Sequence, residues 1–279
     1  MDVYGADFTS RPTRGKPITC LHCRLEGGVL RAQTLETFPD FDAFEAMLQR
    51  PGPWIAGLDF PFGQARKFIE TIGWPARWAE YVRHAKGLGR QRFRDALEAY
   101  RRDRADGDKE HRRATDIAAG STSPQKLYGT PVALMFFEGA PRLIRAGVTI
   151  PHMLAGASDR IVVETYPGVL ARQIVGRRAY KNDASVRQTP ALLEARRDIL
   201  EGLCAGARRE QIGFEVAAER HLCDDAGGDQ LDALLCAVQA AWAWRNRANR
   251  YGAPDPVDPR EGWIADPVVT RRASHPETS

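Results

Sequence analysis

The chain lacks any apolar run long enough to cross a bilayer, although hydrophobic residues make up 43% of its 279 residues. A membrane-spanning helix needs about 20 consecutive apolar residues. The first residues, MDVYGADF, also lack the basic start, apolar stretch and small-residue cleavage site of a signal peptide. We therefore expect a cytoplasmic protein with no membrane partner.

Cysteine is scarce, and its pattern excludes a disulfide framework. The five cysteines are odd in number and scattered along the chain, which is typical of reduced thiols. Cys20 and Cys23 form a C-x-x-C within ITCLHCRL, which has the composition of a strand. Positions three apart in a strand point to opposite faces, and no second cysteine pair could complete a zinc site. We expect no zinc here.

A strong excess of one charge is also absent. The net charge is +4 and the sequence pI is about 8.9. These values permit a polyanionic partner without requiring one. The length allows either one large domain or a core domain that carries an insertion, because a prior of one domain per about 150 residues is soft.

The first sixty residues have the pattern of four strands and one helix. Residues 2–8, 17–25 and 28–37 read as an antiparallel meander with a turn at Glu26, Gly27 and Gly28. Residues 41–49 have helical spacing, and residues 54–60 form the fourth strand. Because this strand follows a helical crossover, we expect it to run parallel to a meander strand.

The middle of the chain is mainly helical and highly charged. Residues 64–120 carry many arginines interrupted by acids and interleaved with aromatics. This pattern fits a solvated helical surface, and it also fits a lobe that faces nucleic acid. Residues 121–129 have loop composition, and residues 131–154 form short apolar pieces broken by Gly and Pro.

The last third contains one strand and two clear helices. A fully apolar strand begins at Arg160 and ends at Glu164, and a helix begins with Thr189 as N-cap and Pro190 as first residue. Residues 212–216 fit a short strand or a helix start. Residues 226–245 form a helix with a buried stripe, and residues 268–279 have the composition of a loose tail.

These elements predict an α/β fold. Its mixed sheet would combine the three-strand antiparallel meander with parallel strands and be flanked by helices. We predict three regions: residues 1–63 and 159–245 form the core, residues 64–158 form a large, mainly helical insertion, and residues 246–279 form an irregular C-terminal segment and tail.

Carboxylates follow three of the apolar strands. Asp7, Asp59 and Glu164 stand at strand ends, where ligand sites form in open α/β sheets. Asp229 and Asp232 lie three residues apart and therefore share a face at the first turn of the late helix. If the first and fourth strands are neighbours, their like charges require a compensating cation.

The composition of this group favours a hard metal ion. It contains no His or Cys, and oxygen ligands suit Mg²⁺ or Mn²⁺. Two such ions about 4 Å apart can activate a water and stabilise the leaving oxygen of a phosphodiester. Gly5 shares the face of Asp7 and Gly57 that of Asp59, so we expect empty space beside each carboxylate.

Each acid also has a structural explanation. Asp7 and Asp59 could open turns, Asp229 could be an N-cap with Asp232 favoured by the helix dipole, and Glu164 could pair with an arginine. Taken one at a time, these explanations do not predict that all the acids follow apolar runs or begin a helix, in the order of elements that a single fold would have. The combination favours a site.

Four segments together resemble a known family. GADFTS, GLDFPFG, VVETYPG and GGDQLDALLCAVQAA are similar to those of the uncharacterised family called domain of unknown function 429, which is regarded as a predicted RNase H-like nuclease family. HRRATD, residues 111–116, is a weaker match. The resemblance covers the chain from Val3 to about Ile264, and it implies an RNase H-like fold.

The resemblance implies a site with Asp7, Asp59, Asp229 and Asp232 as ligands of Mg²⁺ or Mn²⁺. It leaves Glu164 either as an assisting catalytic residue or as the partner of an arginine, and Arg113 and Asp116 could face the cleft. The implied activity is that of a metal-dependent nuclease.

Two other functions remain open. One is ATP-dependent phosphoryl transfer, as in actin-like sugar kinases, although residues 8–16 lack the Gly-rich phosphate hairpin of that class. The other is a catalytically idle nucleic-acid-binding protein. The sequence does not determine whether the substrate is DNA or RNA, whether cleavage is endonucleolytic or exonucleolytic, or what the oligomeric state is.

Overall fold

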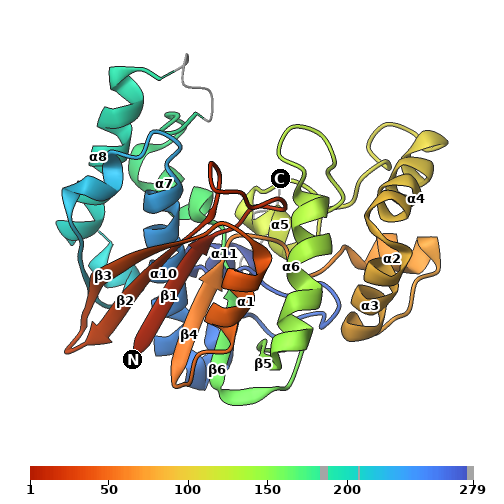
Figure 1. The fold of residues 1–279 in the computed structure, drawn as a ribbon, viewed down its shortest axis with the longest axis horizontal. Helices are drawn as coiled ribbons and strands as arrows, with labels where there is room; N and C mark the ends of the chain where they lie inside the picture. Colours follow the sequence, from red (N-terminus) through yellow and green to blue (C-terminus); the bar gives the residue numbers. More distant parts are fainter. Residues whose placement is uncertain (183–187, 207, 275–279) are drawn as a thin grey trace.

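A mixed seven-stranded sheet forms the centre of the molecule (Figure 1). The computed structural model describes residues 1–182, 188–206 and 208–274. The strand order is β5-β6-β4-β1-β2-β3-β7. The strands are β1 (Asp2–Asp7), β2 (Ile18–Glu26), β3 (Val29–Phe38), β4 (Trp54–Leu58), β5 (Val148–Thr149), β6 (Ala157–Glu164) and β7 (Glu215–Ala217).

The N-terminal part folds as the sequence predicts. β1, β2 and β3 form an antiparallel meander. Helix α1 (Phe41–Leu48) follows, and its N-cap Asp40 accepts a hydrogen bond from the Ala43 amide at 2.9 Å. β4 then pairs parallel with β1, and β6 pairs parallel with β4. The α/β class and the mixed sheet are therefore confirmed.

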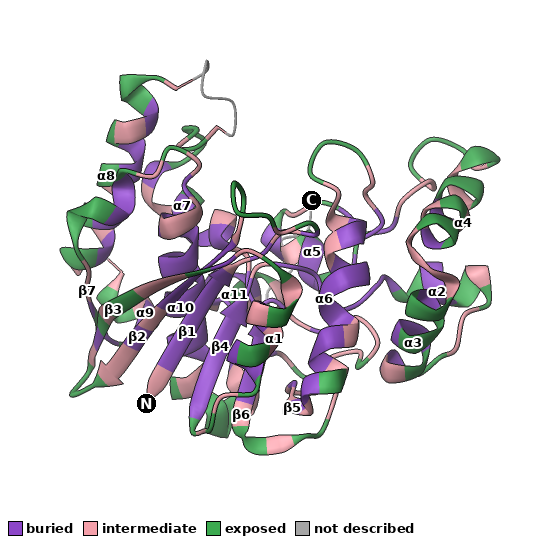
Figure 2. Cartoon of the chain, viewed as in Figure 1, coloured by how far each residue is buried: buried purple, intermediate pink, exposed green. Residues whose placement is uncertain are grey.

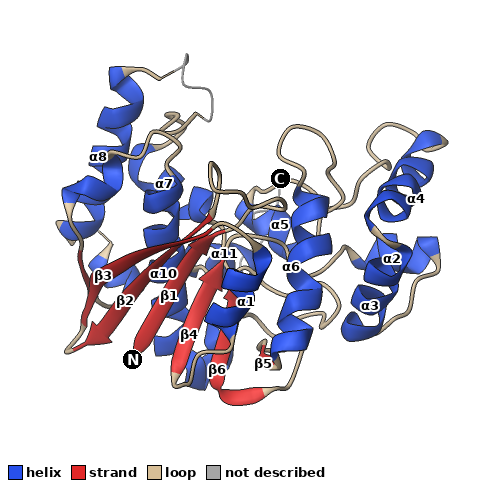
Figure 3. Ribbon diagram, in the orientation of Figure 1, coloured by secondary structure: helices blue, strands red, loops and turns tan. Residues whose placement is uncertain are grey.

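Helices cover both faces of the sheet (Figure 3). α10 packs across β1, β2 and β4 on one face, while α1 and α6 lie on the other. The remaining helices are α2 (Arg66–Ile72), α3 (Trp78–Leu88), α4 (Arg90–Arg102), α5 (Ala114–Ala119), α6 (Val132–Ala146), α7 (Pro167–Val175), α8 (Pro190–Cys204), α9 (Arg209–Ile212), α10 (Asp229–Arg245) and α11 (Pro267–Ser274), with 3₁₀ turns at Arg220–Cys223 and Arg247–Gly252.

The sheet separates two hydrophobic cores, because successive side chains of a strand point to opposite faces. Val3 and Ile55 pack with α7, α8 and α10, whereas Tyr4 and Ala56 pack with α1 and with helices α2, α3, α4 and α6. Figure 2 shows the central strands and the inner helix faces as buried. Cys20 and Cys23 lie in different cores as free thiols, which confirms that they point to opposite faces.

The prediction of short apolar pieces over residues 131–154 is wrong. Residues 132–146 form the continuous helix α6, which passes through Gly139 and Pro141. A Cβ at Gly139 would lie 2.4 Å from the ring of Phe60, so the glycine lets the helix approach the core closely. The helix buries ten of its fifteen residues, and this packing outweighs the low helix propensity of Gly and Pro.

Two further helices were not predicted. Pro167, three residues after the strand end at Glu164, is the first residue of α7. The expected loose tail contains α11, whose Val268 and Val269 are buried against Ala119 of α5. Residues 275–279 lie outside the described part. Of the two alternatives for residues 212–216, the short strand is found, because β7 begins at Glu215; the helix start is wrong, because α9 ends at Ile212.

The described helices include none with the combined length and apolar character that a bilayer crossing requires. The segment between β4 and β6 contains helices α2–α6 and the short strand β5, which pairs with β6 at the edge of the sheet.

Candidate functional site

Asp7 and Asp59 stand at the ends of two adjacent parallel strands. Ala6 of β1 aligns with Leu58 of β4, and the Asp59 amide donates to the Ala6 carbonyl at 3.0 Å. Alternation along each strand places both carboxylates on the face covered by α10. The predicted pairing of the two strand-end acids therefore occurs in the structure.

Gly5 and Gly57 allow α10 to pack directly on the strands that carry these acids. A Cβ at Gly5 would lie 2.0 Å from the Ala233 carbonyl oxygen and 2.2 Å from the Ala237 amide nitrogen. A Cβ at Gly57 would lie 2.4 Å from the Cys236 carbonyl oxygen. The expectation of empty space beside each carboxylate is wrong, because helix backbone fills it. The close contact fixes the distance between the first turn of α10 and the ends of β1 and β4.

The first turn of α10 carries Asp229 and Asp232. Asp232 is fully buried and accepts a hydrogen bond from the Tyr180 hydroxyl at 2.7 Å. The N-cap of α10 is Gly228, so the interpretation of Asp229 as N-cap is wrong. Asp225 instead accepts from the Gln230 amide at 3.1 Å, which leaves the Asp229 carboxylate partly exposed beside the site.

The acids interact electrostatically. Burial raises the pKa of Asp7 well above its ordinary value, Lys181 opposes the rise, and Asp232, Asp59 and Asp229 add to it. Burial likewise raises the pKa of Asp59 to about 7, against the charge of Lys181. The carboxylates are thus close enough for each to disfavour the charge of the others.

Lys181 was not predicted from the sequence. Its ammonium group donates to Asp232. Burial opposes its charge, but Asp232, Tyr180 and Asp7 hold the pKa of Lys181 well above its ordinary value. It lies in the connection between α7 and α8, where no periodic pattern marks it, so the sequence offered no signal for its role.

Glu164 points to the opposite face of the sheet from Asp59. It aligns with Leu58, one residue before Asp59, and Leu58 belongs to the core that packs with α1 and α6. Arg113 binds Glu164 in a bidentate pair, with Nη1 to Oε2 at 2.8 Å and Nη2 to Oε1 at 2.5 Å. The Phe62 amide donates to the same carboxylate at 2.9 Å.

Arg113 also binds Asp116. Its Nε donates to Oδ2 at 2.9 Å and its Nη2 to Oδ1 at 2.8 Å, and the Ser121 hydroxyl donates to Asp116 at 2.8 Å. Burial opposes the charge of Arg113, yet Asp116 and Glu164 raise its pKa well above the ordinary value. The structure therefore places Glu164 in a hydrogen-bonded pair with an arginine, apart from the group formed by Asp7 and Asp232.

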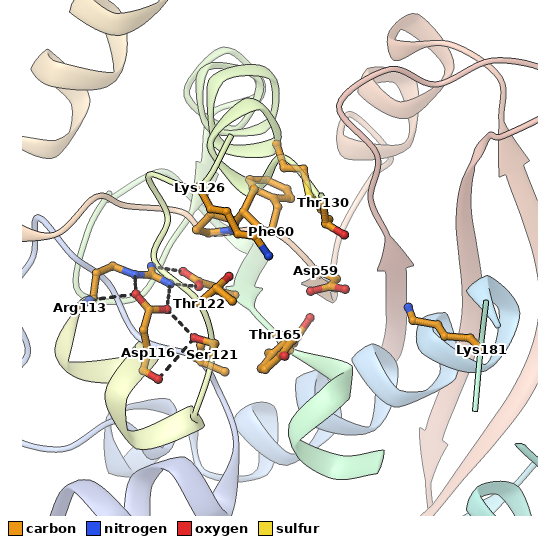
Figure 4. A pocket seen from close by; sticks show the side chains of 16 residues that line it. Asp59, Phe60, Arg113, Asp116, Ser121, Thr122, Lys126, Thr130, Thr165 and Lys181 are labelled. Carbon is orange, nitrogen blue, oxygen red and sulfur yellow. Dashed lines mark hydrogen bonds and ion pairs between the residues drawn. The ribbon is translucent and has the colours of Figure 1, made fainter. Parts of the chain in front are cut away.

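A cavity of about 300 Å³ lies between these two groups, and both contribute to its wall. Asp59 and Lys181 line one side, and Arg113 and Asp116 line another. In Figure 4, Lys126 and Lys181 approach Asp59 from different sides. The remaining polar lining consists of hydroxyls and one buried carboxylate: Ser121, Thr122, Thr130, Thr165, Tyr166 and Glu164.

Thr165 follows Glu164 and adds a buried hydroxyl to the cavity. Its Oγ1 is buried and lies beside the Cys236 thiol. The ETYP segment thus marks two different roles, an arginine-bound carboxylate at Glu164 and a cavity-lining hydroxyl at Thr165.

The donor chemistry of the aspartates fits a hard cation. In the described ranges, no three His, Cys, Asp or Glu side chains are placed closely enough to hold a metal ion. The carboxylates are nevertheless crowded, and an ammonium group already lies against one of them. Oxygen ligands of this kind suit Mg²⁺ or Mn²⁺, and Asp7 and Asp59 would be the first to hold such an ion.

The chain matches a protein-family model. Neither the curated proteins nor the solved structures contain a significant match to this chain. A family model described as "Protein of unknown function (DUF429)" matches residues 7–257. The match includes Asp7, Asp59, Glu164, Asp229 and Asp232, and it covers most of the 279 residues. The chain therefore belongs to the DUF429 family.

Proposed function

We propose that this protein is a divalent-metal-dependent nuclease with an RNase H-like fold. The observation that carries the proposal is the convergence of Asp7 and Asp59, from two parallel strand ends, with Asp232 at the start of α10. The antiparallel meander followed by a helix and a parallel strand supports the fold assignment.

Asp7 and Asp59 would hold Mg²⁺ or Mn²⁺, with Asp229 and Asp232 completing the acidic wall. A divalent ion bound there supplies an activated water and stabilises charge on a phosphodiester. Burial and mutual repulsion raise the pKa values of Asp7 and Asp59, so both carboxylates would gain from a neighbouring cation.

The cavity wall suits a phosphate group. Lys126 provides a positive charge opposite Asp59, and Thr130 and Thr165 provide hydroxyl donors. A charge-assisted hydrogen bond from an ammonium group to a phosphate oxygen is stronger than a neutral one. These side chains would orient a phosphodiester against the carboxylates, while Arg113 stays committed to Glu164 and Asp116.

A cleavage assay tests the proposal. Purified protein is incubated with single-stranded, duplex and branched DNA and RNA, with Mg²⁺, Mn²⁺ or EDTA. We expect cleavage that EDTA abolishes. Asp7→Asn should lose more than the roughly 10–100-fold that removal of outer hydrogen-bond partners of metal ligands costs.

The matched control is Asp106→Asn, since Asp106 is 96% exposed and pairs only locally with Lys109. This variant should cleave like the wild type. If the wild type cuts none of the substrates, or if Asp7→Asn cuts as well as the wild type, the nuclease proposal is wrong. ATP turnover without nucleic-acid cleavage would indicate phosphoryl transfer, and binding without cleavage would indicate an idle site.

A further inference from the structure

Lys181 reaches the acidic group from the surface of the molecule. Its side chain is 41% exposed, whereas the Asp232 side chain that it contacts is fully buried. The aliphatic part runs over Gly228, where a Cβ would lie 2.9 Å from Lys181 Cβ. Because residue 228 at the N-cap of α10 is a glycine, the Lys181 side chain has room to pass over it and reach Asp232.

The backbone next to Lys181 is held in place. Arg196 of α8 is buried, and its Nη1 donates to the Tyr180 carbonyl at 2.8 Å. Its Nε donates to the Cys223 carbonyl at 2.7 Å. Tyr180 itself donates to Asp232 at 2.7 Å. These contacts hold the backbone beside Lys181 in place, so the ammonium group has a fixed position in the site.

The charge of Lys181 acts on the whole group. It interacts with Asp7, Asp59 and Asp229 as well as with its hydrogen-bond partner Asp232. Lys16 is a further positive charge that acts on Asp229. Among the described residues, four carboxylates therefore interact with one ammonium group that is bonded to Asp232, and its charge only partly offsets the effect of burial on Asp7 and Asp59.

We infer that the group of aspartates holds two cations and that the Lys181 ammonium group is one of them. The site then binds a single divalent ion, held by Asp7 and Asp59, while Lys181 neutralises Asp232. This inference rests on the proposed function. It assigns Lys181 as a positioning residue, because a second ion about 4 Å from the first would have to displace the ammonium group from its carboxylate.

Titration with Mn²⁺ tests the inference independently of cleavage. Free Mn²⁺ is followed by electron paramagnetic resonance with the full chain, and the number of bound ions is counted. We expect one ion for the wild type and for Lys181→Arg, which keeps the positive charge. We expect two ions for Lys181→Met and for Lys181→Gln, because both variants remove that charge.

Lys109→Met is the matched control, since Lys109 is 42% exposed, close to the 41% of Lys181, and pairs with Asp106 outside the site. It should bind one ion. Two ions in the wild type, or one ion in both Lys181→Met and Lys181→Gln, would overturn the inference. Absence of Mn²⁺ binding in all variants would overturn it together with the metal-dependent function.

The two proposals can fail separately. If the wild type binds one ion and Lys181→Met binds two, but no nucleic acid is cleaved, the assignment of Lys181 stands and the nuclease proposal fails. If the wild type binds two ions and cleaves nucleic acid, the nuclease proposal stands and the assignment of Lys181 is wrong.

Discussion

The two acidic groups beside the cavity differ in how their charge is balanced. Around Arg113, two carboxylates share one guanidinium with four side-chain hydrogen bonds, and amide and hydroxyl donors add to them. Around Lys181, the described residues place four carboxylates near one ammonium group, which is hydrogen-bonded to Asp232. Both carboxylates of the first group are hydrogen-bonded to their cation, whereas in the second group burial and the neighbouring carboxylates still raise the pKa values of Asp7 and Asp59.

This difference separates structural from chemical roles. The Arg113 group joins the start of α5 to β6, and Arg113 also donates to the Glu261 carbonyl at 2.9 Å. It ties three distant segments together. The Lys181 group joins β1, β4 and α10 around carboxylates that raise the pKa values of Asp7 and Asp59. A buried carboxylate is thus a candidate metal ligand only where no cationic side chain is bonded to it.

Removal of Arg113 should have the largest effect on stability. Arg113→Met leaves Glu164 and Asp116 buried without their cation, and breaking a buried ion pair on one side costs about 3–5 kcal/mol. Urea denaturation should show this loss in the free energy of unfolding. Arg220→Met is the matched control, because Arg220 pairs with Glu201 while 75% exposed, and it should cost less than about 0.5 kcal/mol. Equal effects of the two variants would contradict the structural role of Arg113.

A methyl group at Gly5 should separate α10 from the sheet. Gly5→Ala places a Cβ 2.0 Å from the Ala233 carbonyl oxygen, and overpacking of this kind costs about 1–3 kcal/mol or more. Gly87→Ala, in the exposed part of α3 with open space around its Cβ, should instead stabilise the protein by about 0.5–1 kcal/mol. Urea midpoints of both variants measure the contrast, and a stable Gly5→Ala protein would show that α10 does not pack as described.

The pH dependence of stability should reveal how strongly burial disfavours the charged form of Asp59. Burial raises the pKa of Asp59 from 3.8 to about 7, so between these pH values the folded protein binds more protons than the unfolded chain. The free energy of unfolding should therefore fall as pH rises through this window. Asp59→Asn removes this contribution.

Melting temperatures in EDTA at pH 4.5 and 7.5 measure the effect. Asp59→Asn should exceed the wild type slightly at pH 4.5 and by a larger margin at pH 7.5. A wild type that is more stable than Asp59→Asn at pH 7.5 would mean that the Asp59 carboxylate is matched by a cation in the folded protein without added metal.

Local sequence patterns determined the sheet and its two strand-end aspartates. The meander, the helical crossover and the strand ending at Asp59 follow from alternation, turn residues and helical spacing. The parallel pairing of β1 and β4 then placed Asp7 beside Asp59. Each of these steps depends on residues close in sequence and on general rules of chain connection.

The tertiary structure alone decided which neighbours each acid has. The register that aligns Glu164 with Leu58 turned Glu164 toward Arg113, and a shift of one residue would have turned it toward α10. Gly5 and Gly57 admit helix backbone because α10 packs there. Lys181 reaches Asp232 from 51 residues away in sequence. No local pattern encodes contacts between segments this far apart, because they form only when the sheet, its register and the covering helix are all in place.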